Sequence, residues 1–204
     1  MDEPLSNLDA ALRVAMRVLI KRLHQTMRTT FVYVTHDQAE AMTMADRIVV
    51  MRDGVIQHLG TPHDIYHQPS NLFVASFLGS PQINLVEGKL ERAESGMAFV
   101  RGDFRTALDR PWLDGQNGRT VMLGLRPEDV RVGNGALDGV VELVSPLGSE
   151  QYANVRIAGL DLVVRIDKDM AIAPGDHLRL GVEPRRLHLF DQQTGHSLTA
   201  SGGS

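Results

Sequence analysis

The first third of the chain switches between helical and strand-like patterns of apolar residues. Apolar side chains recur every three or four positions from Leu5 to Met27, which indicates an amphipathic helix. Ser6, followed by Asp9 three residues later, predicts a capping box at its start. Residues 29–35 (TTFVYVT) are β-branched and aromatic with little alternation, which predicts a strand buried on both faces in a parallel sheet. Together these patterns predict a helix-covered α/β layer.

Shorter elements are expected next. Residues 37–45 read as a short helix with Asp37 as its N-cap and Glu40 three positions further on. Residues 47–59 read as a β-hairpin, because Asp53-Gly54 supplies the positive φ that a tight turn needs. Another capped helix should open at 61–64, where a threonine precedes a proline.

The pattern of apolar and polar residues changes near Ser80-Pro81. Beyond this point the helical period disappears, and short alternating strands are separated by Gly, Pro, Asp and Asn turns. We therefore expect two domains, one over residues 1–80 and an all-β domain over residues 81–204.

The second domain contains an internal repeat. Residues 122–127 (MLGLRP) resemble residues 179–184 (RLGVEP), and one offset of 57 residues separates both Gly124 from Gly181 and Pro127 from Pro184. A looser similarity links 88–91 (GKLE) to 139–142 (GVVE). The repeat predicts two related small barrels that share and complete one core.

Composition narrows the functional classes. A hydrophobic content of 43% and a charged content of 23% are typical of a folded globular chain. The formal net charge of -4 disfavours nucleic acid as a partner. The absence of cysteine excludes disulfide scaffolds and thiol chemistry. There is no apolar run of the roughly 18 residues needed to span a bilayer, so a soluble, cytoplasmic chain is expected.

The candidate chemistry lies in the first domain. Asp2-Glu3 opens the chain, residues 6–9 (SNLD) follow at once, and His36 ends the predicted strand. Acids near a helix start are usually solvated, and a histidine after a strand is usually a turn residue. Their order within this pattern is more specific than any of them alone.

These segments resemble ABC-transporter ATPases. The resemblance is carried by residues 1–10 (MDEPLSNLDA), 31–45 (FVYVTHDQAEAMTMA) and 45–54 (ADRIVVMRDG). Residues 60–81 (GTPHDIYHQPSNLFVASFLGSP) are similar to the exit segment of importer ATPases that serve sugars and glycerol-3-phosphate. Residues 124–128 (GLRPE) and 147–150 (LGSE) resemble the regulatory β-domain of those subunits.

The resemblance implies a fold. The chain looks like the C-terminal portion of a carbohydrate or glycerol-3-phosphate importer ATP-binding subunit, similar to the maltose-importer ATPase. Residues 1–80 would be the α/β remnant of a P-loop nucleotide-binding domain. Residues 81–204 would be a regulatory domain of two OB-like (TOBE/MOP-type) barrels.

The resemblance also implies residue roles. Asp2 would be the Walker B aspartate that holds Mg²⁺, and Glu3 the general base that activates water. His36 would be the switch histidine that contacts the γ-phosphate. The dimer-interface D-loop would consist of Ser6, Asn7, Leu8 and Asp9. The implied cofactors of the intact subunit are ATP and Mg²⁺.

Other parts of such a nucleotide site are not found in this sequence. A glycine-rich phosphate loop is missing, because Gly88-Lys89 is followed by Leu90 and has Ile83 at the required glycine position. The glutamine loop and the Leu-Ser-Gly-Gly-Gln signature of the family are missing as well. We therefore expect this chain alone neither to bind ATP tightly nor to hydrolyse it. Residues 1 to about 78 should also expose apolar surface on the long helix and on 29–35.

The implied partners are a second ATPase subunit and transmembrane permease subunits, which would hold the chain at the inner face of the membrane. A regulatory protein or ligand could act on the β-domain. An alternative function is a stand-alone, ligand-sensing β-domain protein without ATPase activity. An oligonucleotide-binding barrel is disfavoured by the acidic balance and the 5% aromatic content. The sequence does not identify the transported solute.

Two further features have ordinary explanations. Arg13, Arg17, Lys21 and Arg28 share one side of the long helix, and a solvated face is favoured over a subunit contact. Residues 196–204 are expected to form a flexible tail.

Overall fold

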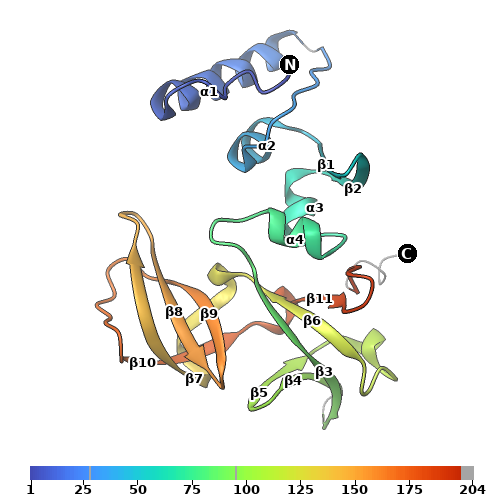
Figure 1. Cartoon of the computed structure of the whole chain (residues 1–204), viewed down its shortest axis with the longest axis vertical. Helices are drawn as coiled ribbons and strands as arrows, with labels where there is room; N and C mark the ends of the chain where they lie inside the picture. Colours follow the sequence, from blue (N-terminus) through green and yellow to red (C-terminus); the bar gives the residue numbers. More distant parts are fainter. Residues whose placement is uncertain (28, 95, 199–204) are drawn as a thin grey trace. The chain divides into compact units, whose positions relative to one another are not determined.

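The computed structural model describes residues 1–27, 29–94 and 96–198, and the chain forms two compact units (Figure 1). They comprise Met1–Pro69 and Ser70–Ser204. Helix α4 (Leu72–Phe77) therefore groups with the β-rich unit rather than with the residues before it. Its first N–H, from Leu72, donates to the carbonyl of Gly195 at 2.9 Å, and its Ala75 packs with Ile83 and Phe190.

The predicted long helix is present but shorter than expected. Helix α1 spans Ala10–Met27, and the Oδ1 atom of Asp9 accepts the Leu12 N–H at 2.9 Å. The Ser6 hydroxyl donates instead to the carbonyl of Glu3 at 3.0 Å. The predicted cap at Ser6 is therefore wrong, because this hydroxyl closes a turn that precedes the helix.

The short helices and the hairpin predicted after residue 36 are confirmed. Helix α2 (Gln38–Met44) is capped by Asp37, and α3 (Pro62–His67) has a complete capping box between Thr61 and Asp64. Strands β1 (Ile48–Arg52) and β2 (Val55–Gly60) pair antiparallel. The turn between them has positive φ at both Asp53 and Gly54.

The predicted buried strand over 29–35 is wrong. This segment forms one isolated parallel bridge, between Asp2 and Val34, and Val32 remains 73% exposed. A strand buried on both faces needs paired neighbours and covering layers. Among the described residues, main-chain hydrogen bonds join this segment only to residues 1–3. The predicted α/β layer is thus not formed by the described residues of this unit. The expected apolar exposure on α1 is confirmed at Leu12, Val14, Val18, Leu19, Leu23 and Met27.

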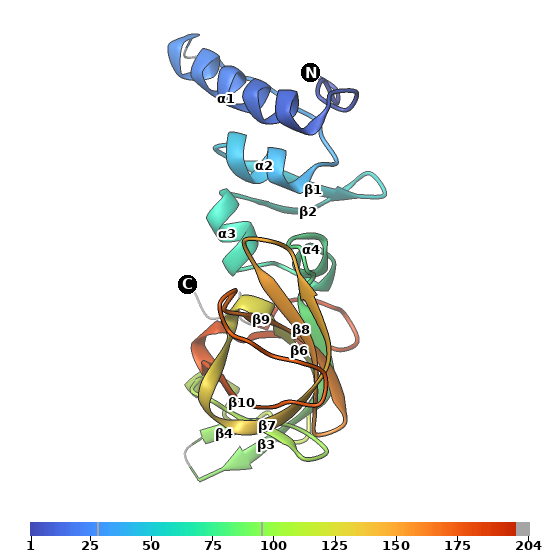
Figure 2. The ribbon, with the colours of Figure 1, turned by 90° about the vertical axis from the view of Figure 1, so that its left-hand side faces the viewer.

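The second unit is built from two antiparallel sheets, which lie side by side in Figure 1 and one in front of the other in Figure 2. One has the order β11-β6-β3-β4-β5, and the other β10-β7-β8-β9. The strands of the first are β3 (Asn84–Ala93), β4 (Gly96–Arg101), β5 (Phe104–Leu108), β6 (Thr120–Leu125) and β11 (His188–Asp191). Those of the second are β7 (Val130–Pro146), β8 (Gln151–Ile157), β9 (Leu160–Ile166) and β10 (His177–Val182). Short 3₁₀ turns lie at Pro111–Leu113, Pro127–Asp129 and Pro184–Arg186.

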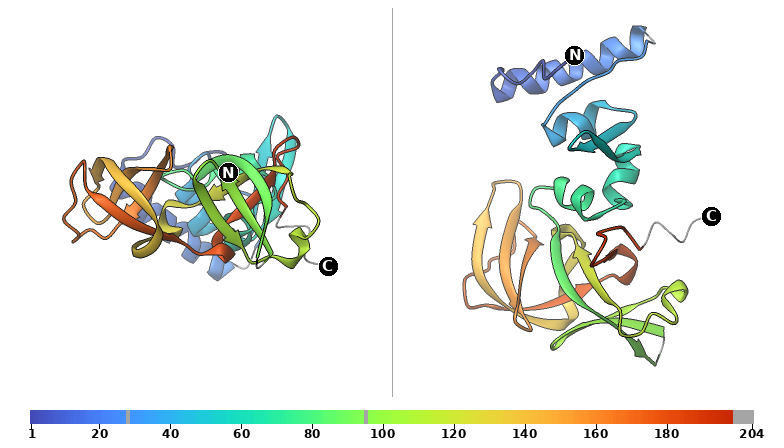
Figure 3. Two further views of the ribbon diagram at one scale, coloured as in Figure 1. Left: turned by 90° about the horizontal axis from the view of Figure 1, so that it is seen from below. Right: turned by 45° about the vertical axis from the view of Figure 1, so that its right-hand side comes forward.

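The sequence repeat appears as an exchange of strands between the two sheets. Strand β6 continues through the Pro127–Asp129 turn into β7, whose first residues pair with β10, so that Arg131 lies opposite Gly181. Strand β10 continues through the Pro184–Arg186 turn into β11, which pairs with β6, so that His188 lies opposite Gly124. These two pairings are equivalent under the repeat offset, and Figure 3 shows dark red β11 returning beside yellow-green β6. Each half therefore completes the sheet of the other.

One apolar core joins the two sheets. It contains Leu123 and Leu189 from the first sheet and Val155 and Leu180 from the second, all fully buried. Asn84 also links the sheets, because its side-chain amide accepts the Val163 N–H at 2.7 Å and donates to the Val163 carbonyl at 2.9 Å. Of the predicted pair of related small barrels, the shared core is thereby confirmed.

The predicted flexible tail is wrong in its first part. The Ser197 N–H donates to the carbonyl of Ser70 at 2.8 Å, and the Leu198 N–H donates to that of Leu189 at 2.7 Å. These bonds hold the segment against the β-rich unit, which the local sequence could not indicate. Residues 199–204 lie outside the described residues.

Candidate functional site

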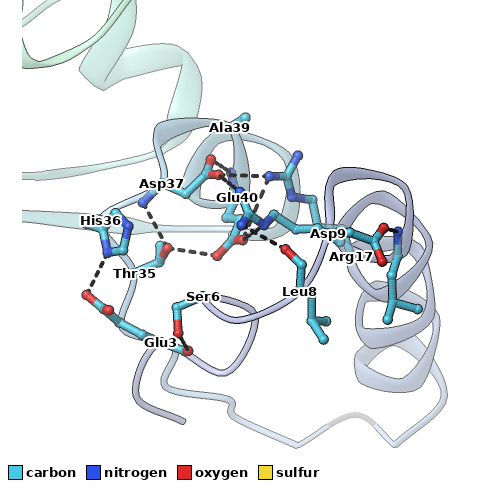
Figure 4. Close-up of polar contacts among 12 residues, drawn as sticks. Glu3, Ser6, Leu8, Asp9, Arg17, Thr35, His36, Asp37, Ala39 and Glu40 are labelled. Carbon is cyan, nitrogen blue, oxygen red and sulfur yellow. Dashed lines mark hydrogen bonds and ion pairs between the residues drawn. The ribbon is translucent and has the colours of Figure 1, made fainter.

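The structure brings two of the predicted catalytic residues into contact. The Nδ1 atom of His36 lies 2.8 Å from the Oε1 atom of Glu3, although 33 positions separate the two residues (Figure 4). At this distance the imidazole N–H donates to the carboxylate. The hydrogen bond to Glu3 and, after it, the negative charge of Glu3 raise the pKa of His36. The imidazole remains 73% exposed, so it can still meet a ligand from solution.

Main-chain bonds place Glu3 beside the segment that carries His36. The Glu3 N–H donates to the Val34 carbonyl at 2.9 Å, and the Val34 N–H donates to the Met1 carbonyl at 2.8 Å. Glu3 itself adopts a left-handed backbone conformation with φ of 41°. Such a conformation is strained for a residue with a side chain, and strain of this kind is common at functional sites. Asp2 forms the isolated parallel bridge with Val34 and is exposed.

The predicted residues 6–9 form a turn between Glu3 and α1. The Ser6 N–H also donates to the Glu3 carbonyl at 3.2 Å, and the Leu8 N–H donates to the Leu5 carbonyl at 3.2 Å. Leu5 is 2% exposed and anchors the turn. Asn7 is exposed, and Asp9 caps α1. The turn thus presents Ser6 and Asn7 outward while its ends are fixed.

A cluster of two arginines and two carboxylates connects α1 with α2. The Arg17 Nη2 atom donates to Asp37 Oδ2 at 3.0 Å, and Arg13 Nη1 lies 3.5 Å from the same oxygen. The Oε1 atom of Glu40 lies 3.7 Å from Arg17 Nη2 and 3.9 Å from Arg13 Nε. Lys21 donates to the Thr43 carbonyl at 2.6 Å. We refer to Arg13, Arg17, Asp37 and Glu40 as the ion-pair cluster.

The ion-pair cluster corrects the interpretation of the basic stripe on the long helix as a solvated face. Three residues of the basic stripe, Arg13, Arg17 and Lys21, contact α2 or its N-cap. The side chain of Arg17 is only 18% exposed. The repeat of basic residues every four positions did indicate one helix face. Whether that face meets solvent or another helix depended on the tertiary structure. Arg28 lies outside the described residues.

Glu40 is the buried centre of this region, and the sequence did not identify it as a site residue. Its Oε2 atom accepts hydrogen bonds from the Thr35 hydroxyl at 2.7 Å and the Tyr33 hydroxyl at 3.0 Å. Burial, followed by the hydrogen bond to Glu40, raises the pKa of Tyr33 to about 12. The Thr35 hydroxyl also accepts the Asp37 N–H at 3.0 Å. The loop that carries His36 is therefore fixed on both sides.

These groups line one small, open concavity. Its walls are formed by Glu3, Ser6, Arg13, Thr35, His36, Asp37 and Glu40. Within the described parts of the chain, no three His, Asp or Glu side chains are placed to hold a metal ion by themselves. A carboxylate such as Asp2 suits Mg²⁺ when phosphate oxygens and water supply the other ligands. The arrangement can orient a water at Glu3 and donate a hydrogen bond from His36.

Two domain families match the β-rich unit. The TOBE domain matches residues 123–190, and the MalK OB fold domain matches residues 79–130. The mostly β architecture of this unit agrees with both matches. They meet at the Pro127–Asp129 turn, where the chain passes from one sheet to the other.

Full-length comparisons extend the similarity to the first unit. An uncharacterised ABC transporter ATP-binding protein, YurJ of Bacillus subtilis, is 45% identical, and 95% of this chain is aligned with 56% of YurJ. The oligosaccharides import ATP-binding protein MsmX of the same organism is 41% identical over the same shares of the two chains. The sn-glycerol-3-phosphate import ATP-binding protein UgpC 2 of Agrobacterium fabrum is 42% identical over 98% of this chain and 54% of its own length.

The chain is homologous to ABC importer ATP-binding proteins. The predicted resemblance to the sugar and glycerol-3-phosphate importers is thereby confirmed. The chain spans about half the length of the importer relatives that it matches. Within the described ranges of this chain, none of the helices combines the length and the apolar character that a membrane span requires.

Proposed function

We propose that this chain forms part of the energy-coupling, ATP-hydrolysing subunit of an ABC importer for carbohydrates or sn-glycerol-3-phosphate. Residues 1–80 would belong to the nucleotide-binding domain and residues 81–204 to the regulatory β-domain. The proposal is carried by the contact of 2.8 Å between Glu3 and His36, two residues that the family resemblance assigns to one site. Homology to importer ATP-binding proteins over most of the chain supports it.

The residues of the site have distinct chemical tasks in this proposal. Asp2 would hold Mg²⁺, which neutralises charge on the terminal phosphates of ATP when it is bound. Glu3 binds His36 through Oε1, so its other oxygen can orient a water and accept a proton from it. The Nδ1–H group of His36 donates to Glu3. When the imidazole is protonated, its Nε2–H group can therefore donate to a phosphate oxygen. The turn Ser6, Asn7, Leu8 and Asp9 would face a second ATPase subunit.

The partners follow from the same assignment. The chain would work with a second ATPase subunit and with transmembrane permease subunits, which would hold it at the inner face of the membrane. A regulatory protein or a small ligand would act on the β-rich unit. In this proposal, the glycine-rich loop that cradles phosphates would be supplied by sequence other than these 204 residues.

ATP turnover tests this function directly. We expect the chain alone to hydrolyse no ATP and to bind it with a Kd above about 1 mM, since one wall of a phosphate site gives little affinity. When the chain is joined to the remaining half of MsmX, hydrolysis should appear. Glu3→Gln should then lower turnover by about 100-fold or more without loss of ATP binding.

Asp53→Asn supplies the matched control, because it removes another exposed carboxylate, at the hairpin turn between β1 and β2. It should leave turnover unchanged. A joined Glu3→Gln protein with full activity would refute the assignment of Glu3 as the general base. Hydrolysis by the chain alone would contradict the expectation that the site needs further sequence.

A second function, a ligand-sensing β-domain protein without ATPase activity, is favoured by one observation. The main apolar core lies entirely between Val86 and Leu189, within the β-rich unit. Under this alternative, sugars or glycerol-3-phosphate should raise the Tm of the chain in a thermal-shift screen. No shift with any of them would exclude these compounds as its ligands.

A further inference from the structure

Arg13 contacts both the turn at residues 6–9 and the start of α2. Its Nη2 atom donates to the Leu8 carbonyl at 3.1 Å, its Nη1 lies 3.5 Å from Asp37 Oδ2, and its Nε lies 3.9 Å from Glu40 Oε1. The guanidinium thus makes one hydrogen bond to the turn and two longer ion pairs to Asp37 and Glu40. A planar fork can meet several acceptors at once, which an ammonium group on a flexible stem does poorly.

The two segments that Arg13 joins are the ones with proposed roles. Leu8 lies in the turn that follows Glu3, and Asp37 directly follows His36. Asp37 also caps α2 by accepting the Glu40 N–H at 3.0 Å. One partly buried side chain, which is 31% exposed, thus contacts both the turn and the residue after His36.

We propose that Arg13 is a positioning residue that couples the turn at residues 6–9 to the loop carrying His36. Binding of a partner at the turn would shift the Leu8 carbonyl, change the contacts of Arg13 with Asp37 and Glu40, and so alter the position of His36. The meaning of this coupling for hydrolysis rests on the proposed function. The coupling itself is a property of the chain without nucleotide.

Arg17 offers a matched comparison. It lies one helical turn further along α1, and its Nη2 atom contacts the same two carboxylates. Its ion pairs go to Asp37 and Glu40, whereas Arg13 also bonds the turn. Arg13→Lys and Arg17→Lys keep the same net charge and both weaken the contact with α2. Only Arg13→Lys should release the turn.

Amide hydrogen exchange of the nucleotide-free chain, followed by NMR, measures the coupling. The reporting amides are Leu8, which bonds the Leu5 carbonyl, and Glu40, which bonds Asp37. Arg13→Lys should accelerate exchange at both amides by about fivefold or more, the effect of losing one charge-assisted hydrogen bond. Arg17→Lys should accelerate exchange at Glu40 and leave Leu8 within about twofold of the original rate.

A double-mutant cycle separates coupling from general loosening. Asp37→Asn keeps a capping side chain but removes the negative charge that pairs with Arg13. Exchange at the Leu8 amide should therefore accelerate, although the substitution makes no direct contact with Leu8. In the Arg13→Lys background, Asp37→Asn should add nothing further at Leu8. If Asp37→Asn leaves Leu8 unchanged, or if Arg17→Lys affects Leu8 as strongly as Arg13→Lys, the proposal is wrong.

Two precautions keep the test decisive. If Arg13→Lys lacks the far-ultraviolet helix signal of the original chain, Asp37→Asn and Arg17→Lys decide alone, by whether the first accelerates Leu8 exchange and the second does not. Because no step uses nucleotide, this result is independent of the ATP hydrolysis test. The coupling can hold even where the ATPase assignment fails.

Discussion

At the scale of residues, the exposed pair of Glu3 and His36 has a pH-dependent effect on folding. The carboxylate raises the pKa of the imidazole in the folded chain above its value of 6.5 in the unfolded chain. The pair therefore stabilises the fold fully at pH values below 6.5. This contribution is lost as the pH rises through the raised pKa of the folded chain. The effect is small because solvent reaches both side chains.

Removal of the carboxylate should lower the pKa of His36. In Glu3→Gln, the imidazole loses both the charged hydrogen bond and the attraction of the anion, so its pKa should fall toward 6.5. A pH titration of the histidine ring signals by NMR measures this. Glu91→Gln, which removes an exposed carboxylate in the β-rich unit, should leave His36 unchanged. An unchanged His36 pKa in Glu3→Gln would show that the pair does not form in solution.

At the scale of elements, the long strand β7 depends on a glycine that the sequence repeat does not mark. The register between β7 and β10 moves from Val132 opposite Leu180 to Asp138 opposite Arg179, so residues 133–137 bulge out of the ladder. Gly135 lies in this bulge, and its carbonyl accepts a hydrogen bond from Arg179 at 3.1 Å. A Cβ atom at Gly135 would lie 1.8 Å from the Leu180 carbonyl carbon.

Gly135→Ala should therefore lower the free energy of unfolding by about 3 kcal/mol, because main chain rather than a flexible side chain blocks the added methyl group. Gly181 faces the same contact from β10, but its Cβ would meet the Gly135 Cα at 3.4 Å, an ordinary contact. Gly181→Ala should change stability by less than about 1 kcal/mol. Urea titrations of both variants measure the difference, and equal effects would contradict this close approach.

At the scale of the whole molecule, the two units differ in how they are stabilised. The β-rich unit encloses the main apolar core, from Val86 to Leu189, whereas α1 of the first unit has no fully buried residue. Burial of apolar surface is the dominant stabilising term in folding. The β-rich unit should therefore fold without the first unit, and the first unit should open more readily.

A deletion of residues 1–69 tests this difference. The remaining residues 70–204 should keep a cooperative thermal transition within about 5 °C of the Tm of the β-rich unit in the full chain, because their core stays complete. In the full chain, amides of α1 should exchange faster than those of β6 and β8. Loss of the cooperative transition, or equal protection of both units, would contradict the prediction.

The sequence determined most features whose cause is local, although the cap predicted at Ser6 did not form. The capped helix after Asp37, the hairpin at Asp53-Gly54 and the capping box at Thr61 formed as predicted, because a few neighbouring residues satisfy the bonds that define them. The repeat also predicted the two related halves, since equal spacing of strand and turn residues fixes equal local structure. The contact between Glu3 and His36 was predicted through resemblance to a family rather than through spacing.

The tertiary structure alone decided where distant segments meet. The strand predicted at 29–35 did not form, because a parallel strand needs paired neighbours. In the described part of the chain, its main chain bonds only to residues 1–3. The exchange of β7 and β11 between the sheets and the role of Asn84 depend on the same kind of distant pairing. Arg13, Arg17 and Glu40 gained their roles in this way as well. Their charges were visible in the sequence, but the free energy of an ion pair depends on distance and burial, which only the folded chain sets.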